Sequence, residues 1–237
     1  MPEPQPWPLS AAATQVLRQP RVSAGVVLQL ALKELVASGA WTLRRDTRRL
    51  RTSVVLLRRG TLPVPDRAPL PLLDHQLRCV VLPGSAMPLR EAVSALARRH
   101  AAGELRDACR ADLVARELLE QVPRRWWLDG WRRVSDEDGL VRDLGRRQRE
   151  LRTALASGGP SADSALRDAD PALLLLLGRR QLRAVDRAVG DARRRGVEIV
   201  VVMGSGDGSL CGLADISATI DSSVDSGGDA GGDGGGD

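Results

Sequence analysis

The sequence predicts a mainly α-helical protein, in which a compact helical domain carries two short β-hairpins as tandem winged-helix-like units and ends in a disordered tail. Apolar residues recur at helical spacing through most of the chain. Two similar stretches, 31–43 and 108–120, each pass from an amphipathic helix into a short apolar strand. From residue 204 Gly, Ser and Asp dominate, a composition that buries too little surface to fold alone. We therefore expect a helical domain over 1–203 and an acidic, disordered tail over 204–237.

The first predicted unit begins with a helix from Ser23 to about Ser38. Ser23 is a favourable N-cap, and Gly39 stands where the end of a helix favours glycine. Strands over 40–43 and 53–57 follow, joined by an arginine-rich turn. A proline-rich linker then ends the unit over 63–71.

The second predicted unit ends in a hairpin that contains three of the five tryptophans, in the segment RRWWLDGWRRV (124–134). Helices starting near Leu72 and at Pro88, and a helix over 104–116, precede it. Two registers are open: a tight turn at Asp129-Gly130, or an earlier turn that pairs 118–121 with 125–128. In both, Trp126 and Trp127 lie on opposite faces, so that one face packs on the helices and the other is free.

The sequence of the last part of the domain predicts two long helices and a strand. One helix starts after Ser135, a loop covers 157–161, and a leucine-rich helix runs from Asp170 to about Arg195. A buried strand over 197–202 leads into glycines spaced G-x-G-x-G. This spacing differs from the dinucleotide-binding motif, and no P-loop lysine follows, so we interpret the segment as an exit into the tail.

Charge is distributed unevenly along the chain. All 35 Lys and Arg residues lie in 1–200, whereas 201–237 holds seven Asp and no base. The body is therefore strongly basic and the end acidic, an arrangement in which a tail can shield basic patches. Lys33 is the only lysine, and Phe and Tyr are absent. A GC-rich genome accounts for this usage, which weakens the basic balance as evidence for an anionic partner.

No catalytic or metal-binding constellation is readable, so we expect a protein without enzymatic activity, metal site or cofactor. Three separated cysteines and two histidines form neither a zinc pattern nor a disulfide framework. The N-terminus has no signal-peptide pattern, and the longest aliphatic run, 172–177, is too short to span a bilayer. We expect a cytoplasmic protein that can associate peripherally with a membrane.

The segment 44–59 is the densest cationic stretch, with seven arginines against the single acid Asp46. A hairpin that carries this charge suits the phosphates of lipid or nucleic acid, because guanidinium groups bind phosphate in a bidentate manner. A solvated turn of an arginine-rich protein explains it equally well. The candidate phosphate-binding residues here are Arg44, Arg45, Arg48, Arg49 and Arg51.

The order of elements resembles the Golgi phosphoprotein 3 family of phosphoinositide-binding peripheral membrane proteins. The similar stretches are SAGVVLQLALKELVASGAWTL (23–43), PLLDHQL (71–77), LREAVSALARR (89–99), ELRDACRADLVARELLEQ (104–121) and DPALLLLL (170–177). The resemblance implies a mostly helical fold with short hairpins, and a head-group site made of arginines and a tryptophan. It also implies a homo-oligomer through the hairpin over 118–134, for which Trp126, Trp127 and Trp131 are the interface candidates.

The family's head-group arginines are matched by Arg106, and next by Arg110. Trp7 and Trp41 lie near the position of its tryptophan, and we take Trp41 as the candidate. The strand over 197–202 and the Asp/Gly-rich tail depart from the family's pattern, which leaves the choice of lipid open.

The function that these observations predict is a non-enzymatic module for anionic phospholipid head groups. The alternative is a tandem winged-helix DNA-binding protein whose arginine-rich hairpin is a wing on phosphates. A helix with polar, base-reading residues on its exposed face would favour DNA. The helix over 24–38 offers only Gln29, Lys33 and Glu34 for that role. A purely structural scaffold is a third possibility.

Overall fold

The computed structural model describes residues 7–48, 51–58, 63–82, 84–122, 130–134, 138–197 and 212–227. Within these residues the chain is mainly helical, with two small antiparallel sheets. The helices are α1 (Ala11–Arg18), α2 (Ala24–Ala37), α3 (Leu70–Arg78), α4 (Leu89–Arg98), α5 (Ala101–Ala115), α6 (Asp138–Ser157), α7 (Gly159–Arg167), α8 (Pro171–Leu175), α9 (Arg179–Arg194) and α10 (Leu213–Gly227). The strands are β1 (Trp41–Arg48), β2 (Arg51–Arg58), β3 (Ala86–Pro88), β4 (Leu119–Gln121) and β5 (Trp131–Arg133).

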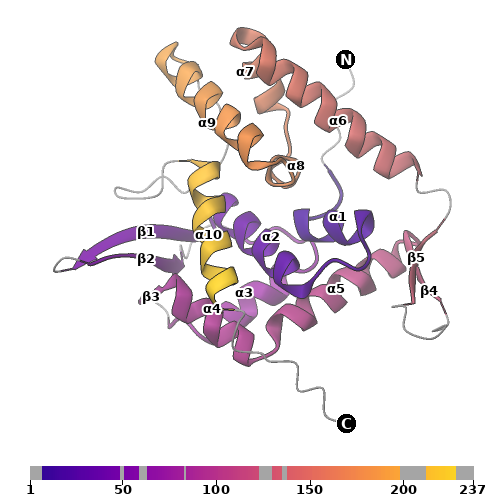
Figure 1. Cartoon of the computed structure of the whole chain (residues 1–237), viewed down its shortest axis with the longest axis vertical. Coiled ribbons are helices and arrows are strands. Elements are labelled where there is room, and N and C mark those ends of the chain that lie inside the picture. The colour runs from indigo at the N-terminus through magenta and orange to yellow at the C-terminus, as the bar shows by residue number, and fades with distance from the viewer. Residues whose placement is uncertain are drawn as a thin grey trace.

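The predicted fold class is confirmed, and the structure adds a helix, α1, before the first predicted unit. Helices α1 and α2 precede β1–β2, and α4 and α5 precede β4–β5 (Figure 1). The Ser23 hydroxyl caps α2 by accepting from Val26 N at 3.4 Å. Gly39 follows its C-terminus with a φ of 77°, a backbone conformation that glycine adopts without a steric cost.

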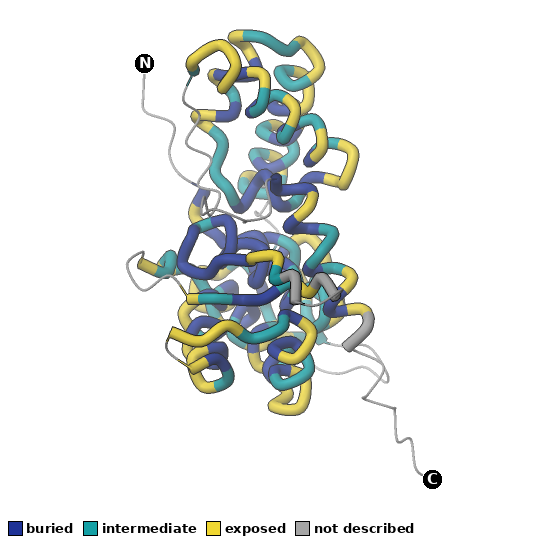
Figure 2. Tube along the Cα trace, turned by 90° about the vertical axis from the view of Figure 1, so that its left-hand side faces the viewer, coloured by how far each residue is buried: buried dark blue, intermediate teal, exposed yellow. Residues whose placement is uncertain are grey.

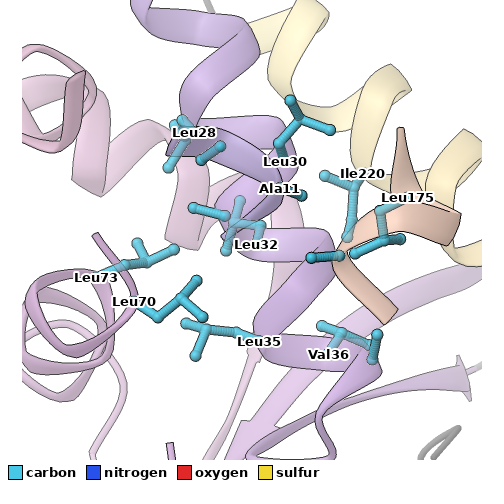
Figure 3. Close-up of a cluster of buried hydrophobic side chains, with 14 of the residues drawn as sticks. Ala11, Leu28, Leu30, Leu32, Leu35, Val36, Leu70, Leu73, Leu175 and Ile220 are labelled. Atoms are coloured by element: carbon cyan, nitrogen blue, oxygen red, sulfur yellow. The ribbon is translucent and has the colours of Figure 1, made fainter. Parts of the chain in front are cut away.

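Helix α2 is the centre of the core. It contacts α1, α3, α5, α8 and α10, and Leu32 and Leu35 are among its fully buried side chains (Figure 3). Leu70 and Leu73 of α3 approach it from one side, and Leu175 and Ile220 from another. A helix that is apolar around most of its circumference has to be buried on most sides, and the polar Lys33 and Glu34 of α2 are buried as well. Figure 2 accordingly shows the buried stretches concentrated in the middle of the molecule.

The two sheets differ in size. Strands β1 and β2 form a long antiparallel hairpin, to which β3 adds a short third strand by pairing with Val55–Leu57 of β2. Strands β4 and β5 pair Leu119 with Arg133 and Gln121 with Trp131. Both registers expected from the sequence are therefore wrong, because they paired Arg133 or Leu119 with residues inside 124–128. Leu119 is buried where β4 packs on α5, and its partner Arg133 is exposed.

Helix α10 corrects the expectation of a tail that starts at residue 204. Its apolar residues Leu213, Ile216, Ile220 and Val224 follow helical spacing and are buried against α2, α4 and α9. The Lys33 ammonium forms an ion pair with Asp221 at 2.5 Å. The apolar surface that α10 covers belongs to helices far away in the sequence. The composition of residues 204–237 alone therefore underestimates how much surface this segment buries. Residues 204–211 and 228–237 lie outside the described residues, as does the predicted strand after Val197.

Helices α6, α7 and α9 pack together at one end of the molecule (top of Figure 1). The loop expected over 157–161 is shorter than predicted, because α7 already begins at Gly159. The leucine-rich helix expected from Asp170 is divided into α8 and α9, and Gly178 is the N-cap of α9. The Asp170 carboxylate caps α8 by accepting from Ala172 N at 2.9 Å.

Candidate functional site

The β1–β2 hairpin carries the arginines that the sequence singles out. Its base is anchored by Leu43, Val55 and Leu56, which are buried in the core. Beyond this base, Arg44 and Arg45 are exposed, and neither forms an ion pair with another described residue. The β1–β2 hairpin projects outward from the helical body (left of Figure 1). It therefore presents cationic side chains away from the core.

The outer half of the β1–β2 hairpin contains further arginines, of which the structure describes only the backbone positions. The register places Arg48 directly opposite Arg51. Arg49 lies outside the described residues, as do the side chains of Arg48 and Arg51. Successive strand residues point to opposite faces, so Arg44 and Arg45 make both faces of the hairpin cationic. An extended arm of this kind can lie across an anionic surface.

Trp41 does not belong to this cationic surface. Its side chain is fully buried, and its indole Nε1 donates to Asp74 Oδ1 at 2.8 Å. The Asp74 carboxylate also forms an ion pair with Arg78, within the same helix α3. The sequence-based assignment of Trp41 to a ligand site is therefore corrected: the ring packs in the core and joins β1 to α3.

Arg110 is also structural rather than free to bind a head group. Its side chain is buried, and Nη2 donates to the Pro20 carbonyl oxygen at 2.9 Å. The guanidinium lies 5.1 Å from the ring centroid of Trp131, which fits a cation–π contact. Arg110 thus ties α5 both to the loop before α2 and to the β4–β5 hairpin.

Arg106, one turn earlier on α5, is the more accessible of the two predicted head-group arginines. Its side chain is 30% exposed and lies 3.9 Å from Asp107. Its Nε is buried and has no hydrogen-bond partner among the described residues. A buried donor without a partner is costly unless water or a ligand satisfies it. Arg106 therefore stays a candidate for anion contact, on a different element from Arg44 and Arg45.

The tryptophan segment is described only in part. Trp131 is half-buried against Arg110, while Arg132 and Glu120 form an exposed ion pair across the hairpin at 2.6 Å. Trp126 and Trp127 lie outside the described residues. The predicted separation of Trp126 and Trp127 onto opposite faces therefore stays a prediction, and of the three tryptophans the structure describes Trp131, which packs on Arg110.

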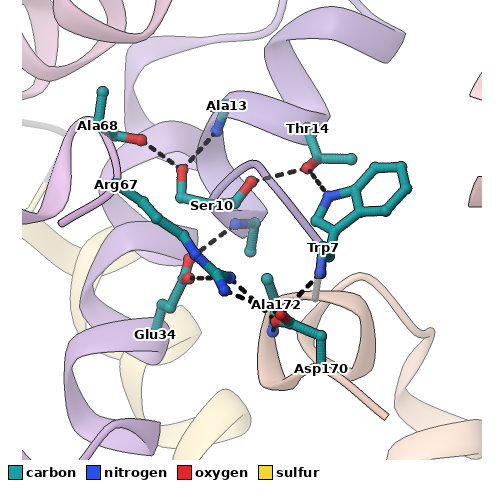
Figure 4. A network of polar contacts seen from close by, with 10 residues as sticks. Trp7, Ser10, Ala13, Thr14, Glu34, Arg67, Ala68, Asp170 and Ala172 are labelled. Carbon is teal, nitrogen blue, oxygen red and sulfur yellow. Dashed lines mark hydrogen bonds and ion pairs between the residues drawn. The ribbon is translucent and has the colours of Figure 1, made fainter. Parts of the chain in front are cut away.

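A buried polar network, which was not predicted from the sequence, connects four distant segments (Figure 4). Glu34 of α2 accepts from Ala11 N at 2.7 Å. Arg67 donates to both carboxylate oxygens of Asp170, at 3.1 and 3.0 Å, and lies 4.0 Å from Glu34. Burial raises the pKa of Glu34 to about 7. No local pattern indicates such a network, because its members are joined only by the fold.

The same network positions the N-terminal segment. Trp7 N donates to Asp170 Oδ2 at 3.2 Å, and Trp7 Nε1 donates to Thr14 Oγ1 at 2.8 Å. Every charged group of the network has a protein partner. A raised carboxyl pKa can mark a general acid, but it also arises in structural networks. The full set of protein contacts favours a structural joint over a reactive site.

The described residues contain no group of three or more His, Cys, Asp and Glu side chains that could hold a metal ion. Cys109 is buried and Cys79 exposed, and both are free thiols. None of the described helices is long and apolar enough to cross a membrane. Comparison with protein-family models, with characterised proteins and with solved structures finds no match for the chain.

Proposed function

We propose that the protein is a non-enzymatic module that binds anionic phospholipid head groups at a membrane surface. The observation that carries the proposal is the β1–β2 hairpin, an arm that projects from the core with Arg44 and Arg45 exposed. A cation near an anionic bilayer contributes about 1 kcal/mol to binding, so several arginines on one arm give useful affinity. The similarity to the Golgi phosphoprotein 3 family, proposed from the sequence, points to a phosphoinositide.

DNA binding is the second candidate, and two features of the helices count against it. A winged-helix protein reads DNA with an exposed helix that precedes the wing. Here α2 precedes the β1–β2 hairpin, and most of its residues are buried. Helix α5 precedes β4–β5, and its exposed residues include the acids Glu104 and Asp107, which repel phosphates.

Vesicle sedimentation tests the lipid proposal. The full chain is mixed with vesicles of phosphatidylcholine alone, or of phosphatidylcholine with phosphatidylserine or phosphatidylinositol 4-phosphate. We expect binding only to the anionic vesicles. Changing Arg44 and Arg45 to Gln removes two cations and should weaken binding about 30-fold, given about 1 kcal/mol for each.

The matched control changes Arg98 and Arg99 to Gln. These residues form another adjacent, exposed arginine pair, at the end of α4. We expect the control to keep most of its binding. Equal weakening of both variants would mean that only total charge matters, and would contradict a hairpin site. Failure to bind any anionic vesicle, together with a mobility shift of duplex DNA, would replace the lipid proposal with the DNA candidate.

A further inference from the structure

A cleft of about 580 Å³ lies among α6, α7 and α9, on elements separate from the β1–β2 hairpin. Small apolar residues form much of its wall, which leaves the space between the helices open. Leu155 and Ala156 come from α6, and Ala184 and Ala188 from α9. Its volume falls within the range of small-molecule sites, about 300–1,000 Å³.

The residues that line the cleft carry a net positive charge. Four arginines and two aspartates give a net charge of +2. Both aspartates already have partners: Asp163 is bound by Arg195 with both contacts at 2.7 Å, and Asp191 forms an ion pair with Arg194 outside the cleft. The other three arginines at the cleft form no ion pair with a described residue; they are Arg152, Arg180 and Arg187.

These three arginines line the cleft from two helices. Arg180 and Arg187 are seven residues apart on α9, which places them two turns apart on one face, and Arg152 lines the same cleft from α6. Like charges around a cleft attract an anion, because its low-dielectric walls focus the field. Guanidinium groups match the oxygens of a phosphate in bidentate geometry. A phosphate monoester, with a charge of about −1.5 to −2, neutralises the lining.

We propose that this cleft binds a phosphate-bearing small molecule with an apolar or flat body. The arginines hold the phosphate, and the apolar body of the ligand packs on Leu155, Ala184 and Ala188. A free inorganic phosphate ion has no apolar part that could fill this wall. The phosphate ester can belong to a soluble nucleotide or to a lipid head group, which share this chemistry. The site is independent of the hairpin.

Isothermal titration of the full chain with adenosine 5′-diphosphate tests the soluble source. Changing Arg180 and Arg187 to Ala should weaken binding by at least about tenfold, since each loses a charge-assisted contact. The control changes Arg179 and Arg183 to Ala. These arginines are exposed on the same helix but do not line the cleft, so binding should be unchanged. Equal losses in both double variants would overturn the site, because they would reflect general surface charge.

A second variant, Ala188→Trp, fills the cleft without removing a charge. It should abolish nucleotide binding, whereas unchanged binding would place the ligand elsewhere and overturn the proposal. Vesicles with phosphatidylinositol 4-phosphate test the lipid source with the same variants. Loss of vesicle binding on Ala188→Trp, without any nucleotide binding by the parent chain, would support the site with a lipid ligand. If neither probe depends on the cleft variants, the proposal fails, whatever the hairpin variants do.

Discussion

Glu34 illustrates how one buried residue can set the pH dependence of the whole protein. Burial raises its pKa from 4.5 to about 7. Between these two pH values, the Glu34 carboxyl is protonated in the folded state but ionised in the unfolded state. The contribution of Glu34 to stability is therefore greatest below about pH 4.5, and it is lost as the pH rises to about 7.

We expect Glu34→Gln to remove most of this pH dependence. The amide oxygen of Gln can still accept from Ala11 N, but it does not ionise. The free energy of unfolding of the parent chain should fall by up to about 3 kcal/mol more between pH 5 and pH 8 than that of the variant. Urea unfolding at the two pH values measures the difference, and parallel curves would mean that Glu34 is already ionised in the fold at pH 5.

Trp41 supplies a second prediction at the level of one residue. Trp41→Phe keeps a ring in the core but leaves the carboxylate of Asp74 without its indole donor. A hydrogen bond to a charged group contributes about 1.5–3 kcal/mol, so stability should fall by this amount. Binding to anionic vesicles should not change at temperatures where the variant is folded. If the Trp41→Phe variant kept normal stability but bound vesicles more weakly, Trp41 would have to be assigned to the ligand site again.

At the scale of single elements, α10 depends on a cap from another helix. Asp186 of α9 accepts from Leu213 N at 2.8 Å and from Ala214 N at 3.0 Å. The approach is so close that a Cβ on Gly212 would lie 2.6 Å from Asp186 Oδ2. The carboxylate satisfies amides that the first turn of any helix leaves unpaired, and its charge favours the positive end of the helix dipole.

Asp186→Ala should therefore loosen α10. Loss of an N-cap costs about 0.5–2 kcal/mol, and amide hydrogens of α10 should exchange faster. Asp191→Ala is the control, because Asp191 lies on the same helix and, among the described residues, forms its ion pair with the exposed Arg194. Surface pairs contribute about 0–1 kcal/mol, so the control should leave exchange in α10 unchanged. Equal acceleration in both variants would show that Asp186 has no special role.

For the whole molecule, the sequence predicts the local order of elements better than their long-range partners. Ser23 and Gly39 delimit α2 because a cap and a stop are local chemistry. The remote cap of α10 has no such local signal. The exposed arginines of the candidate site were predictable from charge density at Arg44 and Arg45. The role of Trp41 was not, since it is decided by Asp74, which lies 33 residues away.

Removal of α10 should abolish cooperative folding. Four buried aliphatic side chains hold it to the core, and each contributes about 1.5–3 kcal/mol. Their sum approaches the total stability of a typical domain, about 5–15 kcal/mol. A chain that ends at residue 211 should therefore lose its thermal transition, whereas one that ends at Gly227 should keep it. An unchanged midpoint in the shorter chain would show that α10 is an accessory element.

The position of α10 also has a consequence for biosynthesis. Its contacts with α2 join residues far apart in the sequence, such as Gln29 and Asp225, whose side chains are 3.1 Å apart. The ribosome releases the chain from the N-terminus, so the face of α2 that packs on α10 stays uncovered until residues 213–227 have been synthesised. Exposed apolar surface on a nascent chain invites aggregation and chaperone binding. Completion of the core around α2 therefore waits for the synthesis of α10.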